Sequence, residues 1–107
     1  MSAAHDHASC QHTARSAAER LAAAAVEQHL AACVHLTPLR SVYLWQGRVQ
    51  HDAEVALAFK TSAASAPRLR AFILSQHPYE LPALYTLEVA EASAPYRDWI
   101  VAGTQPG

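Results

Sequence analysis

Cys33 and His35 have the side-chain types and the spacing that metal binding requires. They alternate with other residues in an extended run, so they share one face of the predicted strand. A thiol and an imidazole are common metal ligands, although a buried small thiol beside an exposed ring is the commoner arrangement. The 107-residue chain also contains seven histidines, which weakly indicate metal or proton chemistry.

The run His77-Pro78-Tyr79-Glu80 brings an imidazole, a phenol and a carboxylate together at the predicted end of a helix. His77 in that place would also stabilise the last helix carbonyls, where the helix dipole favours a cation. Spacing alone leaves both a structural role and a true site open. The single lysine, Lys60, ends an apolar run, and we expect it to form an ion pair with Glu80 or Glu88.

Composition excludes several classes of function. The net charge is -1 and the arginines are scattered, which argues against a nucleic-acid partner. No apolar run approaches the roughly 18 residues that a membrane span requires. The chain has three glycines and no Gly-rich phosphate loop. The first residues lack a basic segment followed by an apolar core, so we expect a cytoplasmic protein in which Cys10 and Cys33 are free thiols or metal ligands.

Two alternating runs on either side of Gln46-Gly47 predict a long hairpin, because Gly47 supplies the positive φ that a tight reversal requires. Pro38 predicts a bend or bulge in the first of these strands. We expect a helix over residues 13–32, with Thr13 as N-cap and Val26 on its inward stripe. A second helix should be capped by Ser65 and end before Pro78, with Leu69 and Ile73 packed inward. We expect residues 3–10 to form a weak strand, with a frayed tail over residues 1–11 as the alternative. A further strand is expected over residues 81–89 and a short terminal helix over residues 93–100.

This order predicts a single domain over residues 1–107 with an α+β, ferredoxin-like fold: strand, helix, strand, strand, helix, strand and a short C-terminal helix. Two helices would cover one face of the sheet. The other face would carry exposed aromatic side chains, for which Tyr43, Trp45 and Tyr85 are the candidates. An uncovered apolar face usually marks an interface, so we expect an oligomer.

Five motifs occur in an order and spacing typical of one family. They are Leu30-Ala31-Ala32-Cys33, Tyr43-x-Trp45-x-Gly47, Glu54-Val55-x-Leu57-x-x-Lys60-Thr61, His77-Pro78-Tyr79-Glu80 and Tyr96-x-x-Trp99. Through these motifs the chain resembles the CutA family of divalent-cation tolerance proteins over residues 13–102. The resemblance implies a ferredoxin-like fold and a homotrimer similar to that of the PII signalling proteins, with hairpins packed across subunits.

The resemblance also implies a non-enzymatic protein that binds divalent metal ions. The copper ligands proposed in the family match Cys10 and His77, with one copper ion per subunit that is not required for folding. A second histidine, present in some members, is Gln76 here. A thiolate and an imidazole suit copper better than magnesium or calcium. The first strand differs from that of relatives, and metal ligation by His5 and His7 is a hypothesis specific to this chain.

A small-ligand pocket in the cleft between subunits is an alternative to metal binding. Cys33, Trp45, Lys60, Tyr79 and Glu80 match positions that line this cleft in the family. A third hypothesis, an enzyme that uses His77 and Glu80 as an acid–base pair, is the weakest of the three.

Overall fold

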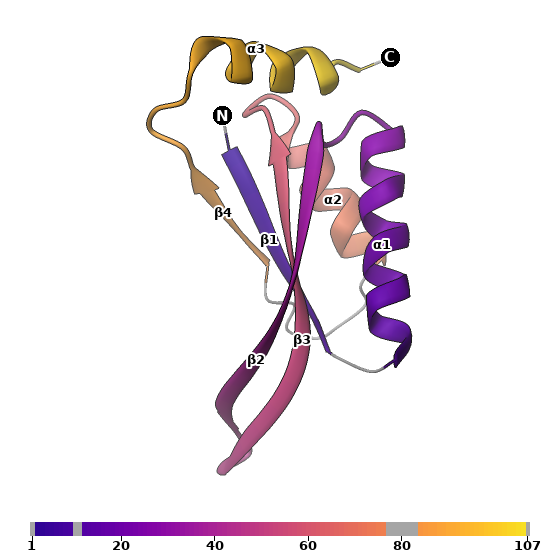
Figure 1. Cartoon of the computed structure of the whole chain (residues 1–107), viewed down its shortest axis with the longest axis vertical. Helices are drawn as coiled ribbons and strands as arrows, with labels where there is room; N and C mark the ends of the chain where they lie inside the picture. The colour runs from indigo at the N-terminus through magenta and orange to yellow at the C-terminus, as the bar shows by residue number, and fades with distance from the viewer. Residues whose placement is uncertain (1, 10–11, 77–83, 107) are drawn as a thin grey trace.

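A computed structural model of the chain describes residues 2–9, 12–76 and 84–106, with side chains from residue 15 onward in these ranges. It is a mixed α/β structure in the predicted order of elements (Figure 1). The elements are β1 (Ser2–Ser9), α1 (His12–Glu27), β2 (Cys33–Trp45), β3 (Arg48–Thr61), α2 (Ala66–Gln76), β4 (Leu84–Glu88) and α3 (Ala94–Gly103). Within these ranges, no helix is long and apolar enough to cross a membrane.

The four strands form one antiparallel sheet in the order β2-β3-β1-β4. The predicted first strand is confirmed, and β1 lies between two neighbours. Ser2 to Ser9 pair with Thr61 to Glu54 of β3, and Ser2 to Asp6 pair with Glu88 to Leu84 of β4. The alanines and serines of this segment have a low strand propensity. Pairing with a strand on each side stabilises the extended conformation of β1 despite this.

Helices α1 and α2 pack on one face of the sheet around the alternate side chains Val55, Leu57 and Phe59 of β3 (Figure 1). The same core includes Leu69 and Ile73 of α2, as the helical spacing predicted. From α1 and the residues that follow it, the core takes Ala18, Leu21, Ala22, Ala25, Leu30 and Ala31. Val26, which was also expected to point inward, is instead 40% exposed.

The β2–β3 hairpin is longer than the rest of the sheet and extends past the helices (Figure 1). Its pairing is continuous from Cys33 and Lys60 to Trp45 and Arg48, so the bulge predicted at Pro38 is wrong. β2 is an edge strand of this sheet, and a proline is tolerated there because one side of the strand needs no ladder hydrogen bonds. The predicted reversal is confirmed.

The turn of the hairpin uses two residues with positive φ, Gln46 at 52° and Gly47 at 77°. Positive φ at both central residues is the type I′ geometry, which matches the right-handed twist of the paired strands. Trp45 and Arg48 are the pair that closes the turn.

Helix α1 ends at Glu27, earlier than the predicted Ala32. His29 has a φ of 59°; its N–H donates to the Val26 carbonyl at 3.0 Å, and the Leu30 N–H donates to the Ala25 carbonyl at 2.9 Å. These two bonds form a Schellman motif, which ends the helix although the sequence remains helix-favouring. The predicted N-cap, Thr13, lies inside the helix, because α1 begins at His12.

Candidate functional site

The face of the sheet opposite α1 and α2 carries the residues that alternate with the core positions. Directly paired residues of antiparallel strands share a face, so Cys33 and Lys60 lie side by side, as do His35 and Ala58. We call this surface the open face. Its described members are Cys33, His35, Thr37, Ala56, Ala58, Lys60, Tyr85 and Leu87.

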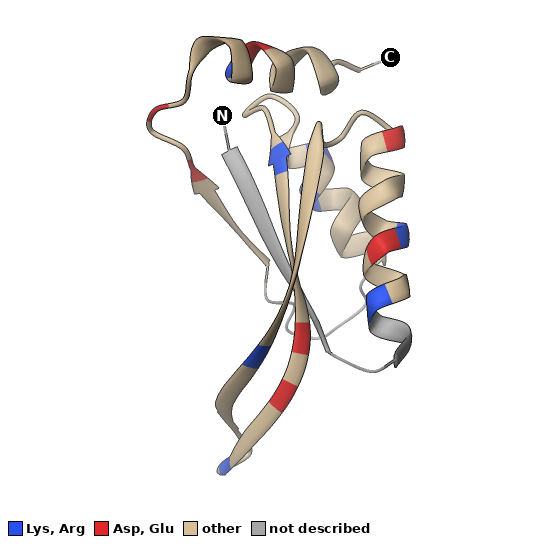
Figure 2. Cartoon of the chain, in the orientation of Figure 1, with Lys and Arg blue, Asp and Glu red and all other residues tan. Residues whose placement is uncertain are grey.

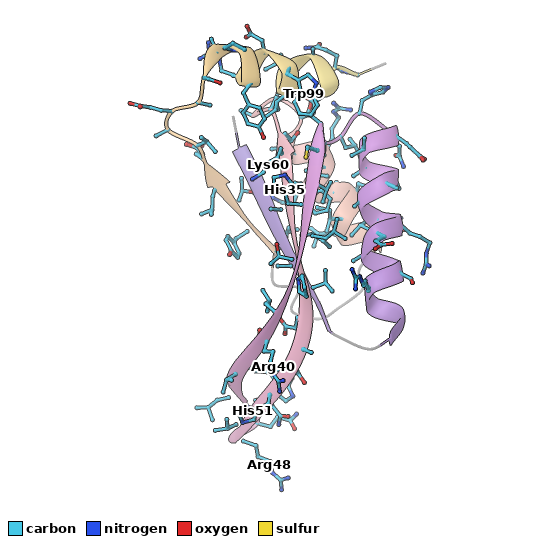
Figure 3. The ribbon with its side chains drawn as sticks, viewed as in Figure 1. His35, Arg40, Arg48, His51, Lys60 and Trp99 are labelled. Carbon is cyan, nitrogen blue, oxygen red and sulfur yellow. The ribbon has the colours of Figure 1, made fainter. Side chains whose placement is uncertain are left out.

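Lys60 lies near the end of β3, directly opposite Cys33 and diagonal to His35 (Figure 3). Lys60 and Cys33 are half-buried, His35 is exposed, and Cys33 is a free thiol. Figure 2 shows the basic segment of Lys60 at this end of β3 beside an uncharged stretch of β2. Within the described residues, the Lys60 ammonium makes no hydrogen bond or ion pair.

The expected ion pair between Lys60 and Glu88 is wrong. Glu88 pairs with Ser2 of β1, and Ser2 pairs with Thr61 of β3. Glu88 therefore lies level with Thr61, one residue beyond Lys60. A shift of one residue places a side chain on the opposite face of the sheet. The other expected partner, Glu80, lies outside the described residues.

Helix α3 crosses the end of the sheet near Lys60 (Figure 1). Trp99 lies on the side of α3 that faces the sheet, above Lys60 and His35 (Figure 3). The rings of Tyr96 and Trp99 are stacked, with centroids 6.1 Å apart and planes at 19°. The Trp99 side chain is 53% exposed, so it presents an open aromatic surface at this end of the open face.

A buried polar network fixes the C-terminal end of α3. Thr104 Oγ1 donates to the Ile100 carbonyl at 2.8 Å and lies 3.0 Å from Ser62 Oγ. Ser65 was expected to cap α2 through its side chain, but its hydroxyl donates to the Thr104 carbonyl at 2.7 Å. Arg68 Nη2 in turn donates to Ser65 Oγ at 2.9 Å. Position 103 must be small because a Cβ on Gly103 would lie 3.1 Å from the Ala32 Cβ.

The distal half of the hairpin, residues 40–53, forms an arm with two exposed faces. Val42, Leu44 and Val49 share one face, and Leu44 is 70% exposed. Tyr43 and Trp45 lie on the other face and are also exposed.

Polar bonds along the arm stabilise the face that carries Tyr43. Ser41 donates to Glu54 at 2.8 Å, and the Tyr43 hydroxyl donates to Asp52. This bond to the Asp52 carboxylate raises the pKa of Tyr43 above its usual value, with smaller contributions from desolvation and from the charges of Asp52 and Glu54.

Trp45 and Lys60 were both predicted to line a cleft, but one chain does not bring them together. Trp45 is twelve residues along β2 from Cys33, the partner of Lys60. At the rise of an extended strand this separation is roughly 40 Å. The hairpin therefore presents Trp45 far from its own Lys60.

Most of the chain matches the model of one protein family. Residues 8–103 match the family model of the CutA1 divalent ion tolerance protein. The chain belongs to the CutA family. Resemblance through the five motifs is thereby confirmed, and the matched range includes the whole open face and α3.

Two curated relatives from the CutA family show how far the likeness extends. The divalent-cation tolerance protein CutA of Thermus thermophilus is 41% identical over 88 residues, which cover 81% of this chain and 85% of the relative. Protein CutA of Mus musculus is 40% identical over 84 residues, 78% of this chain but only 48% of the relative. The chain thus spans about half the length of the mammalian relatives that it matches.

A solved structure from the same family has the same fold. The PII-like protein CutA from Nostoc sp. PCC 7120, in its apo form, superposes with a TM-score of 0.86 at 36% identity, and the match covers 100% of both chains. CutA from Synechococcus elongatus PCC7942 gives a TM-score of 0.87 at 36% identity, with 97% of this chain and 89% of that chain covered.

The metal ligands implied by the CutA resemblance, Cys10 and His77, lie outside the described residues, as do Tyr79 and Glu80. Gln76 is the last residue of α2, and its Nε2 donates to Ser75 Oγ at 3.4 Å. In register, His5 and His7 are the backbone partners of Ala58 and Ala56. Among the described residues, no three His, Cys, Asp or Glu side chains gather as a metal site would require.

Tyr96 and Trp99 form one of the five family motifs, but they were not predicted to belong to a functional site. Their stacking forms an aromatic surface, and Trp99 lies on the side of α3 that faces the end of the sheet with Lys60 (Figure 3). The signal was present in the sequence, because residues three apart on a helix lie on one face. What the sequence did not reveal is the polar network of Ser62, Ser65 and Thr104, which orients that helix.

Proposed function

We propose that this chain forms a homotrimer with a ferredoxin-like subunit that binds divalent cations, copper in particular, in the cytoplasm and without enzymatic activity. The observation that carries the proposal is membership of the divalent ion tolerance family over residues 8–103. No nucleic acid or membrane takes part in it, in keeping with the near-neutral charge and the scattered arginines.

The exposed apolar side chains support assembly of several copies. The arm presents Val42, Leu44 and Val49 on one face and Trp45 on the other, while Tyr85 and Leu87 are exposed on the open face. Exposed apolar side chains that are neighbours on one face, such as Leu44 and its strand partner Val49, mark an interface in soluble proteins. In a closed ring of identical chains each arm packs on the next copy. The exposed apolar side chains of every copy are then buried in the same way.

Copper binding in the proposal uses Cys10 and His77, with one ion per subunit. A thiolate and an imidazole form a soft donor set that suits copper. Two donors leave room for water or for a group from the next copy, and Gln76 takes the place of a second histidine. Folding does not depend on the metal in this proposal, since an apolar core built from Leu57, Phe59 and their neighbours already joins the sheet to both helices.

A second candidate function is the binding of a small ligand in a cleft between copies, with Cys33, Trp45, Lys60, Tyr79 and Glu80 around it. One observation favours it, namely the Lys60 ammonium, which has no partner among the described residues and faces the uncovered side of the sheet. The arm could supply Trp45 of a neighbouring copy. A neighbour of known structure in the family is itself named a PII-like protein.

Calorimetric titration with copper(II) under anaerobic conditions tests the first function. We expect micromolar or tighter binding of one ion per subunit by the wild type and its loss in Cys10→Ala/His77→Ala. A matched control, Cys33→Ala/His29→Ala, also removes one thiol and one imidazole and should retain binding. Free thiols are counted before and after titration, so that oxidation is not mistaken for binding. Equal binding by all three proteins would contradict the proposed ligands.

A further inference from the structure

At one end of the open face, two basic side chains of β2 and β3 lie among small side chains of the same two strands. Cys33 and Ala58, the cross-strand partners of Lys60 and His35, are both small. Next along the strands, Ala56 is small as well and pairs with Thr37. Lys60 and His35 therefore stand above these neighbours on β2 and β3, on the same side of the sheet and diagonal to each other (Figure 3).

An aromatic wall borders the same end of the open face. Trp99 projects from α3 toward this end of the sheet (Figure 3), and its indole stacks on the Tyr96 ring with the two planes at 19°. The network of Thr104, Ser62 and Ser65 anchors the helix that carries it. A flat ring that faces two nitrogen donors is an arrangement that recognises a flat anion, because the ring stacks while the donors bind the charge.

The charge of Lys60 favours a bound anion if the open face is covered by another copy. If further copies pack over the sheet, as the proposed trimer requires, water is partly excluded from a half-buried ammonium. An ammonium that loses water without gaining a partner carries a desolvation cost, and no partner exists among the described residues. A bound anion would remove that cost.

We propose that Lys60, His35 and Trp99 bind a small aromatic carboxylate at this end of the open face. The ammonium and the imidazole take the carboxylate, and the indole stacks on the ring. One lysine and one histidine match a single carboxylate, whereas phosphate sites in proteins usually add backbone N–H groups from a Gly-rich loop or a helix N-terminus. The inference rests on the second candidate function and gives its ligand a chemical class.

Benzoate is a suitable probe, with benzamide as its neutral counterpart and acetate as the anion without a ring. We expect saturable benzoate binding by calorimetry and at least about tenfold weaker binding of the other two, because each lacks one of the recognised features. Benzoate should also change the indole fluorescence of the wild type, and this change should be lost in Trp99→Phe.

Variants then test the residues. Lys60→Met and His35→Gln should each weaken benzoate binding, by about tenfold or more for Lys60→Met, whereas Lys60→Arg should restore most of it. Arg20→Met, which removes an exposed cation on α1, should change nothing. If Lys60→Met prevents assembly, His35→Gln and Lys60→Arg provide the test.

Two outcomes would overturn the inference while leaving the proposed function intact. The first is no saturable benzoate binding by a trimer that still binds copper, as expected if a carboxylate of a neighbouring copy already occupies Lys60. The second is benzoate binding that persists unchanged in Lys60→Met and His35→Gln. Loss of copper binding or of the trimer would count separately, against the function itself.

Discussion

Thr104 Oγ1 lies 3.0 Å from Ser62 Oγ, which joins the residue after α3 to the residue after β3. The two positions are 42 residues apart in sequence, and both side chains are buried. Because β3 ends at Thr61, the contact fixes α3 to the end of the strand that carries Lys60. Through this link the position of Trp99 above Lys60 depends on a few hydroxyl groups.

The network around this contact should contribute to stability. Ser65→Ala removes a buried hydroxyl that donates to the Thr104 carbonyl and accepts from Arg68. We expect a loss of about 1–3 kcal/mol in the free energy of unfolding, because buried partners are left unsatisfied. Urea unfolding at a fixed protein concentration measures it. Ser93→Ala is the matched control, since Ser93 makes no side-chain cap bond and should change stability by less than about 0.5 kcal/mol.

Position 29 offers a stabilising substitution. His29 has a left-handed backbone, with φ at 59°, at the C-terminal end of α1. His29→Gly should raise the free energy of unfolding by about 1 kcal/mol, because glycine adopts this conformation without a Cβ clash. Ala23→Gly, at an exposed position inside the same helix, should lower it by about 1 kcal/mol. Opposite signs in urea unfolding confirm the account of the helix end, and two losses would contradict it.

The bond from Tyr43 to Asp52 predicts a pH dependence at the alkaline end. The pKa of Tyr43 is raised in the folded protein, chiefly by its hydrogen bond to the Asp52 carboxylate. The contribution of this bond to stability is therefore present below the ordinary tyrosine pKa of 10.0 and is lost as the pH rises through the higher, folded value. Phenolate absorbance, compared between wild type and Tyr43→Phe, reports the titration. Asp52→Asn should lower the pKa of Tyr43 toward its ordinary value, and an unchanged titration would count against the bond.

Periodicity predicted most of the fold because alternating and helical patterns have different repeats. The alternation of Val55, Leu57 and Phe59 with more polar residues predicted the second strand of the hairpin, and Gln46-Gly47 predicted the turn. Errors arose where a local device overrides propensity. His29 ends a helix whose sequence remains favourable, and the edge position of β2 lets Pro38 pass without a bulge.

The site was less predictable, because it depends on contacts between distant segments. Lys60 and Cys33 were both identified from the sequence, but only the register shows that they are direct partners and that Glu88 belongs to the other face. Trp99 required the docking of α3, which buried hydroxyl groups determine and no sequence period reveals. Trp45 fits beside Lys60 only if it comes from another copy.

Because Trp45 can lie beside Lys60 only if it comes from another copy, assembly of several copies is the central claim. Leu44 is 70% exposed on the arm, and a lysine there should prevent the arm from packing on the next copy while leaving the core of the subunit untouched. Val26→Lys is the matched control, since Val26 is also exposed but lies on α1 and not on the arm.

Light scattering of the purified wild type, Leu44→Lys and Val26→Lys proteins is the most direct test. The account predicts a mass three times the 11.6 kDa of one chain for the wild type and Val26→Lys, and a smaller mass for Leu44→Lys with unchanged circular dichroism. A wild type that remains at the mass of one chain, or a Leu44→Lys protein that assembles like the wild type, would contradict it.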